Sequence, residues 1–135
     1  FPTRRSSDLP VSMEQIFALD VDVFAPCALG AILNDLTIPM IKAKVIAGAS
    51  NNQLASTRHG QGLMERGILY APDYAINAGG IIEIYHETHG YDAAKTKAHL
   101  DRIGTVLTQI FERATAEKKP THEIADRMAE EIFRR

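Results

Sequence analysis

The sequence contains no tryptophan and only one cysteine, Cys27, among its 135 residues. One thiol cannot form a disulfide within the chain, so a disulfide-stapled scaffold is excluded and a reducing, cytoplasmic setting is expected. No apolar run approaches the length that crosses a bilayer. We find no secretory signal pattern, and we therefore expect no membrane partner.

Positive charge is not in excess either. The 15 Lys and Arg residues are outnumbered by 17 Asp and Glu residues, which gives a formal net charge of −2. Nucleic-acid binders carry concentrated basic surface, so no nucleic-acid partner is expected. The sequence also lacks the G-x-G-x-x-G and G-x-x-x-x-G-K loops that hold phosphate groups.

What the chain does contain is enough apolar sequence, 45% of its residues, for the core of one ordinary domain. Residues 1–9 are polar, lack periodicity and begin without Met. We interpret residues 1–9 as a non-native, adapter-derived scar and exclude them from the fold. We expect residues 10–135 to be the carboxyl portion of a longer protein.

The first half of the domain contains three short β-prone runs, and each is closed by a Pro or a Gly. A polar segment at residues 57–66, ended by Gly67, is predicted to be a helix, and a helical turn is expected at residues 27–33. Alternating strands and helices predict a parallel sheet. The predicted strands are residues 21–25, 44–48 and 68–71.

The second half is predicted to be helical. Residues 75–86 are expected to be mostly helix, although Gly79 and Gly80 each cost about 1 kcal/mol there relative to Ala. That cost suggests a close approach to the backbone, and a Gly–Gly loop between two short helices is the alternative. A long helix at residues 93–116 precedes a last helix that Thr121 caps. The residues expected on the buried face of this last helix are Ile124, Ala125, Met128, Ala129 and Ile132.

Two adjacent amides, Asn51 and Asn52, follow the second predicted strand. Ligands of open α/β sheets bind beyond the carboxyl ends of the strands, so these side chains are expected at a ligand site. A neutral amide offers one acceptor and two donors, which suits a carboxamide, a ribose hydroxyl or a carboxylate. It suits metal or acid–base chemistry less well.

The cysteine and most of the histidines are interpreted as structural residues, without a catalytic or metal-binding role. Cys27 is expected to be a small buried hydrophobe rather than a reactive thiol. His86 and His89 are spaced i, i+3, unlike the i, i+4 pair of a zinc-binding helix, so no metal site is expected. His59 and His122 are expected on helix surfaces.

Several motifs together resemble one family, the Glu/Leu/Phe/Val amino-acid dehydrogenases, and within it most closely the leucine-dehydrogenase branch. The resemblance implies an α/β fold: the C-terminal half of a Rossmann-type doubly wound parallel sheet, of about three strands, followed by two or three C-terminal helices. Residues 10–135 would then be a partial dinucleotide-binding domain. The motifs lie at residues 26–30, 44–54, 58–60, 71–80 and 125–131.

The resemblance also implies a reaction. Family members oxidise an L-amino acid to its 2-oxo acid and ammonia with transfer of hydride to NAD, and the full-length protein is expected to be a homo-oligomer. The resemblance implies no catalytic residue in this chain, because the family's catalytic Lys and Asp belong to a domain that precedes it. The cofactor-binding positions it implies are Ala25, Pro26, Cys27, Ala28, Asn51 and Asn52.

The substrate pocket implied by the resemblance consists of Asn52 with Ile81 and Ile84, which lie on one helical face at i, i+3. Their branched apolar side chains favour a leucine-like substrate over glutamate. Two alternatives stay open. One is a phenylalanine or valine dehydrogenase paralogue, and the other is a non-catalytic half-Rossmann module that binds a nucleotide or a partner protein.

Overall fold

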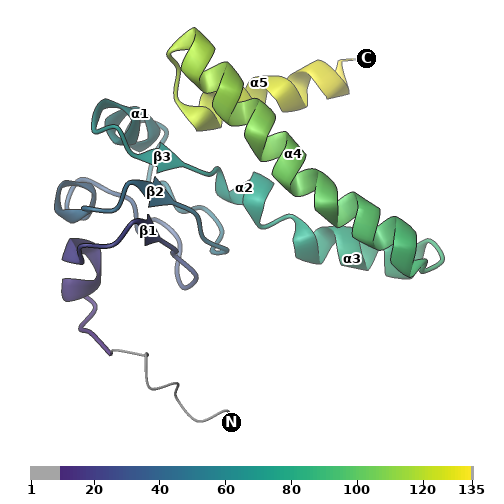
Figure 1. The fold of residues 1–135 in the computed structure, drawn as a ribbon, viewed down its shortest axis with the longest axis horizontal. Helices are drawn as coiled ribbons and strands as arrows, with labels where there is room; N and C mark the ends of the chain where they lie inside the picture. The colour runs from purple at the N-terminus through teal and green to yellow at the C-terminus, as the bar shows by residue number, and fades with distance from the viewer. Residues whose placement is uncertain (1–9, 135) are drawn as a thin grey trace.

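The computed structural model describes residues 10–134, so the expected scar at residues 1–9 lies outside the described residues. Three parallel strands form a sheet in the order β1 (Val23–Phe24), β2 (Val45–Ile46) and β3 (Leu69–Tyr70). Within the described range four helices follow β3, the last of which ends at Phe133 (Figure 1). The predicted α/β class and the half-Rossmann arrangement of parallel strands and C-terminal helices are confirmed.

The sheet is organised around one apolar row. Phe24, Ile46 and Tyr70 lie in register across the three strands, and all three are buried. The residues before them point to the opposite face because side chains alternate along a strand. On that face Val23 remains 52% exposed. The buried row packs with Leu33, Ile38, Ile41, Ala43, Leu63 and Ile68.

Helix α1 (Arg58–Glu65) connects β2 to β3 and ends as the sequence predicts. Gly67 adopts a φ of 69°, a left-handed conformation that glycine reaches at little cost. Its N–H donates to Met64 O at 2.9 Å, while Ile68 N–H donates to Leu63 O at 3.0 Å. These two bonds form a Schellman motif, which turns the chain directly into β3.

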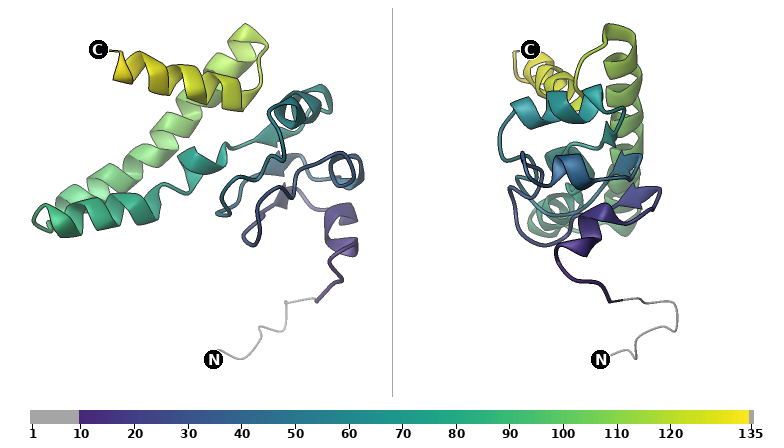
Figure 2. Two further views of the ribbon diagram at one scale, coloured as in Figure 1. Left: turned by 180° about the vertical axis from the view of Figure 1, so that it is seen from behind. Right: turned by 90° about the vertical axis from the view of Figure 1, so that its left-hand side faces the viewer.

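The remaining helices form an arm beside the sheet (Figure 2). Helix α4 (Ala93–Glu117) runs along α2 (Asp73–Ile76) and α3 (Gly79–Thr88), and α5 (Thr121–Phe133) packs across its end. A second apolar cluster joins α4 to α5 through Ile110, Ala114, Ile124 and Ala125. Among the described helices, none is long and apolar enough to cross a membrane.

The helical turn expected at residues 27–33 is wrong. This segment is a loop, in which Ala31 adopts a φ of 56° and Leu33 forms a parallel bridge with Leu54. Ala31 N–H donates to Asn52 O at 2.7 Å, and Leu33 N–H donates to Gln53 O at 2.9 Å. Because these donors are used by a distant loop, they are not available for local helical hydrogen bonds.

The expected helix at residues 75–86 is interrupted, but not at its glycines. Helix α2 ends at Ile76, and Gly79 and Gly80 form the first turn of α3. The expected close approach is not found among the described residues. A Cβ on Gly79 would meet only Leu100 Cδ2 at 3.7 Å, and one on Gly80 would meet nothing within 4 Å.

Two expectations about the last helix are also wrong. Thr121 does not cap α5, because Pro120 occupies the N-cap position and the Thr121 hydroxyl donates to Tyr70 O at 2.7 Å. Thr121 thereby ties α5 to β3 instead. Ile132, expected on the buried face, is 69% exposed, whereas Ile124 is fully buried.

Candidate functional site

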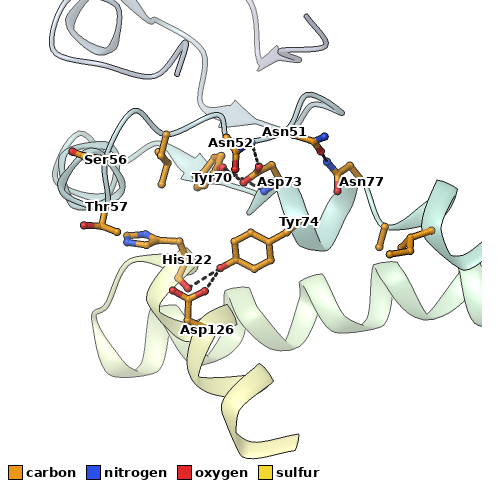
Figure 3. Close-up of a pocket in the computed structure, with 13 residues that line it drawn as sticks. Asn51, Asn52, Ser56, Thr57, Tyr70, Asp73, Tyr74, Asn77, His122 and Asp126 are labelled. Carbon is orange, nitrogen blue, oxygen red and sulfur yellow. Dashed lines mark hydrogen bonds between the residues drawn. The ribbon is translucent and has the colours of Figure 1, made fainter. Parts of the chain in front are cut away.

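A cavity of about 770 Å³ opens beyond the carboxyl ends of β2 and β3 (Figure 3). Asn51 and Asn52 line it from the loop after β2, and Asp73 lines it from the start of α2. Ile81 of α3 and His122 of α5 are among the other residues that line it. The cavity therefore lies where open parallel sheets bind their ligands.

The backbone of Asn52 is held in a left-handed conformation, with a φ of 52°. Its N–H donates to Asp73 Oδ2, and its carbonyl accepts from Ala31 N–H at 2.7 Å. The Asp73 carboxylate is buried, and its second oxygen accepts from the Tyr70 hydroxyl at 3.0 Å. Asn52 is thus fixed from two sides.

Asn51 is held by its side chain. Asn77 Nδ2 donates to Asn51 Oδ1 at 2.6 Å and to Ala49 O at 3.3 Å. Beneath the loop, buried Gln53 donates through Nε2 to Gly48 O at 2.8 Å and to Ser50 O at 2.9 Å. The loop that carries both amides is therefore fastened by two side chains, that of Gln53 within the loop and that of Asn77 at the end of α2.

Tyr74 and Asp126 form the wall opposite the two amides (Figure 3). The Tyr74 hydroxyl donates to Asp126 Oδ1 at 2.6 Å and approaches His122 O at 3.1 Å. Burial, reinforced by Asp126, raises the pKa of Tyr74 above its usual value. Burial and the neighbouring Asp73 raise the pKa of Tyr70 in the same way. Both phenols therefore stay protonated near neutral pH and act as donors.

The two histidines expected on helix surfaces are buried, so that expectation is wrong. His59 accepts a hydrogen bond from Ser56 N–H at 2.9 Å through Nδ1, while its Nε2 lies 3.3 Å from Asp35 Oδ1. His122 is 5% exposed, and its Nδ1 has no hydrogen-bond partner among the described residues. Burial lowers the pKa of His122, which favours the neutral imidazole.

The loop at residues 25–28 lies beside the loop after β2 but does not line the cavity. Buried Pro26 accepts at its carbonyl from Ser50 N–H at 3.0 Å and from Ser50 Oγ at 2.9 Å. Ala25 and Ala28 are exposed. Cys27 is exposed as well, so the expected burial of its thiol is wrong.

Only one of the two isoleucines expected in a substrate pocket lines the cavity. Ile81 lines it and is 71% exposed, whereas Ile84 is 60% exposed and lies outside the lining residues. The cavity therefore brings together Asn51, Asn52 and Ile81. Ile84 continues the same face of α3 one turn further on.

Sequence reasoning missed most of the polar walls of the cavity. Asp73 follows a strand as closely as the amides do, so the strand-end rule could have identified it. Tyr74 of α2 and Asp126 of α5 come together because both helices pack against α4, and no local pattern signals a contact between residues so far apart in the sequence. Among the described residues, no three His, Cys, Asp or Glu side chains are grouped to hold a metal ion.

Comparison with known proteins gives a consistent result. The family model described as Glutamate/Leucine/Phenylalanine/Valine dehydrogenase matches residues 3–131. Leucine dehydrogenase of Geobacillus stearothermophilus is 48% identical over 121 residues, which cover 90% of this chain and 33% of that protein. The chain thus spans about a third of the length of the curated relatives it matches.

Solved structures agree. The crystal structure of L-tryptophan dehydrogenase from Nostoc punctiforme has a TM-score of 0.86 and 50% identity, covering 90% of this chain and 36% of that one. A hetero-hexameric glutamate dehydrogenase from Thermus thermophilus has a TM-score of 0.68 at 18% identity, covering 88% and 30% of the two chains. At that identity the second likeness concerns the fold alone.

Proposed function

Because the chain belongs to the Glutamate/Leucine/Phenylalanine/Valine dehydrogenase family, we propose that it is the carboxyl portion of an amino-acid dehydrogenase. The complete enzyme oxidatively deaminates an L-amino acid with a branched, leucine-like side chain to its 2-oxo acid and ammonia. One observation carries the proposal: Asn51, Asn52 and Ile81 line a single cavity at the ends of parallel strands.

The cavity residues suit NAD as the cofactor. The nicotinamide carboxamide has both a donor and an acceptor, and a neutral Asn side chain can pair with both. Asn51 and Asn52 would bind this end of the cofactor, with the loop of residues 25–28 along its length. When bound, NAD would accept the hydride that leaves the α-carbon of the substrate.

In this proposal the described residues bind and orient the substrate and the cofactor, and they do not exchange protons with them. The phenols of Tyr70 and Tyr74 have raised pKa values, and both oxygens of the Asp73 carboxylate already accept hydrogen bonds. The imidazole of His122 is buried with a lowered pKa. We therefore propose that the general acid–base group of the reaction lies in another part of the complete enzyme, and that the described residues 10–134 contribute no catalytic group.

Ile81 supplies an apolar wall for the substrate side chain, beside the amide of Asn52. An apolar pocket of this kind favours an aliphatic amino acid over glutamate, because a carboxylate would lose its hydration there. One methylene in such a pocket changes discrimination by only about 1–3 kcal/mol, so activity should extend across several branched substrates. We further propose that the complete enzyme is a cytoplasmic homo-oligomer.

The test begins with the in-frame coding sequence upstream of residue 10. We expect it to encode a Gly-rich strand–turn–helix and a Lys-bearing substrate domain. The complete protein should reduce NAD in the presence of L-leucine, L-valine or L-isoleucine, measured by NADH absorbance. Absence of both upstream features, or no oxidation of any L-amino acid, would overturn the proposal.

A matched pair of variants connects the activity to the cavity. Asn52→Ala should lower kcat/KM for L-leucine more than about tenfold, equivalent to about 1.4 kcal/mol of lost transition-state stabilisation. Lys97→Ala, an exposed change on α4 far along the arm, should leave it unchanged. Retained NADH binding without any oxidation would instead support the non-catalytic nucleotide-binding module.

A further inference from the structure

Asp73 is a buried carboxylate at the mouth of the cavity. It is 8% exposed and begins α2, two residues after the third apolar run ends at Ala71. A carboxylate is rarely buried unless its oxygens are satisfied. Here both are: Oδ2 accepts from Asn52 N–H, and Oδ1 accepts from the Tyr70 hydroxyl at 3.0 Å.

The hydrogen bond to Asp73 is made by a residue with a left-handed backbone. That conformation costs most residues other than glycine about 1–2 kcal/mol, and it costs Asn less because its short polar side chain tolerates it. Asn52 adopts it with a φ of 52°. Its carbonyl is already engaged by Ala31 N–H, so Asp73 supplies the contact on the other side of the residue. A hydrogen bond to a charged acceptor is roughly twice as strong as a neutral one.

The geometry points to Asp73 as a positioning residue: its carboxylate holds Asn52 left-handed so that the Asn52 amide faces the cavity. This inference rests on the proposed function, in which Asn52 aligns substrate and cofactor. Asp73 also lines the cavity, but both of its carboxylate oxygens already accept hydrogen bonds from the protein, so it acts through Asn52. Tyr70 has the secondary task of orienting the carboxylate from β3.

A purely structural role of Asp73 would have a different experimental consequence from a positioning role. If Asp73 only stabilised the start of α2, its loss would lower the unfolding midpoint without affecting alignment at Asn52. Misplacing a group by about 1 Å in such a site can lower the rate by about 100-fold. The chemical step should therefore respond more strongly than cofactor binding when the carboxylate is removed.

The experiment uses the complete enzyme and four single variants. Asp73→Leu should lower kcat with L-leucine by about 10- to 100-fold, with a smaller change in the KM for NAD. Asp73→Asn, which retains an acceptor without the charge, should lower kcat by a smaller factor and decides the matter if Asp73→Leu fails to fold. Tyr70→Phe removes only the bond that orients the carboxylate and leaves the Asn52 bond in place, so it should lower kcat by a smaller factor than Asp73→Asn does.

The fourth variant, Asn52→Gly, closes a double-mutant cycle. Glycine adopts the left-handed conformation without strain and removes the amide, so this variant should lose activity by itself. Adding the Asp73 substitution to Asn52→Gly should then lower kcat by less than about twofold more, because the two residues act as one unit.

The outcomes separate the two levels of the proposal. Wild-type enzyme that oxidises no L-amino acid overturns the proposed function before any variant is made. If the wild-type enzyme is active but the losses of kcat multiply in the variant that combines Asn52→Gly with the Asp73 substitution, only the role of Asp73 is overturned. Equal losses in Tyr70→Phe and Asp73→Asn would likewise overturn it, because the Asn52 bond survives in the former.

Discussion

Gly60 and His122 lie so close together that no side chain fits at position 60. A Cβ built on Gly60 would stand 2.2 Å from both Nδ1 and Cε1 of the His122 ring. Gly60 is in α1 and His122 is in α5, so this contact joins the helix beside the sheet to the last helix of the arm. The absence of one Cβ lets the two parts of the fold meet.

Gly60→Ala should therefore destabilise the protein. The new methyl group has to displace a buried imidazole, and overpacking of this kind typically costs about 1–3 kcal/mol. Gly62→Ala is the matched control in the same helix, because its Cβ would meet nothing within 4 Å. That change should stabilise by up to about 1 kcal/mol through helix propensity.

Chemical denaturation of the complete protein measures both free energies of unfolding. The two glycines should change stability in opposite directions, although the substitution and the helix are the same. Equal effects of the two variants would show that His122 does not restrict position 60.

Stability should also depend on pH through His122. Burial lowers the pKa of this imidazole below its ordinary value of about 6.5. Below that ordinary value the unfolded chain binds a proton that the folded protein resists, so stability should fall as pH decreases from 7 toward 5. The fall should level off below the folded-state pKa, where both states are protonated.

Thermal unfolding of His122→Gln across the same pH range checks this assignment. The variant should lose part of the decrease that wild type shows between pH 7 and pH 5. Gln61→Ala, a change in α1 that removes no titratable group, should retain the wild-type slope. A His122→Gln profile parallel to wild type would contradict the assignment.

Local signals were sufficient for most of the fold. Short apolar runs closed by Pro or Gly correctly predicted the three strands, since a proline cannot extend a central strand. Gly67 correctly predicted the end of α1, because a left-handed residue is needed there. These features depend on residues that are close together in the sequence, so local sequence patterns are enough to predict them.

Contacts across long stretches of chain account for the errors. Residues 27–33 form a loop because their donors reach carbonyls near Asn52, about twenty positions later. His122 is buried because Gly60 leaves room for its ring. Asp73 has its role through Asn52 and Tyr70. No periodicity or spacing rule encodes such pairs.

The edge of the sheet should cause the 135-residue chain to associate. Within the described residues β1 pairs on one side only, with β2, and Val23 is 52% exposed. An unpaired, apolar strand edge is a template for pairing with another chain. Sedimentation should therefore show association that increases with concentration.

Val23→Lys should reduce this association, because an edge lysine opposes strand pairing. Met13→Lys is the control, since Met13 is 87% exposed but lies before η1 (Gln15–Ala18), outside the sheet. A wild-type chain that stays monomeric and unfolds in one sharp thermal transition would contradict the expectation.

Substrate preference should respond to Ile81 more than to Ile84, since Ile81 alone of the two lines the cavity. In the complete enzyme, Ile81→Ala removes an apolar wall and should shift the kcat/KM ratio toward larger side chains. With about 1–3 kcal/mol per methylene-sized change, the ratio for L-phenylalanine over L-valine should rise about tenfold or more. Ile84→Ala should give a smaller shift, and Glu87→Ala, an exposed change on α3, should give none. An unchanged ratio in an active Ile81→Ala enzyme would remove Ile81 from the substrate pocket.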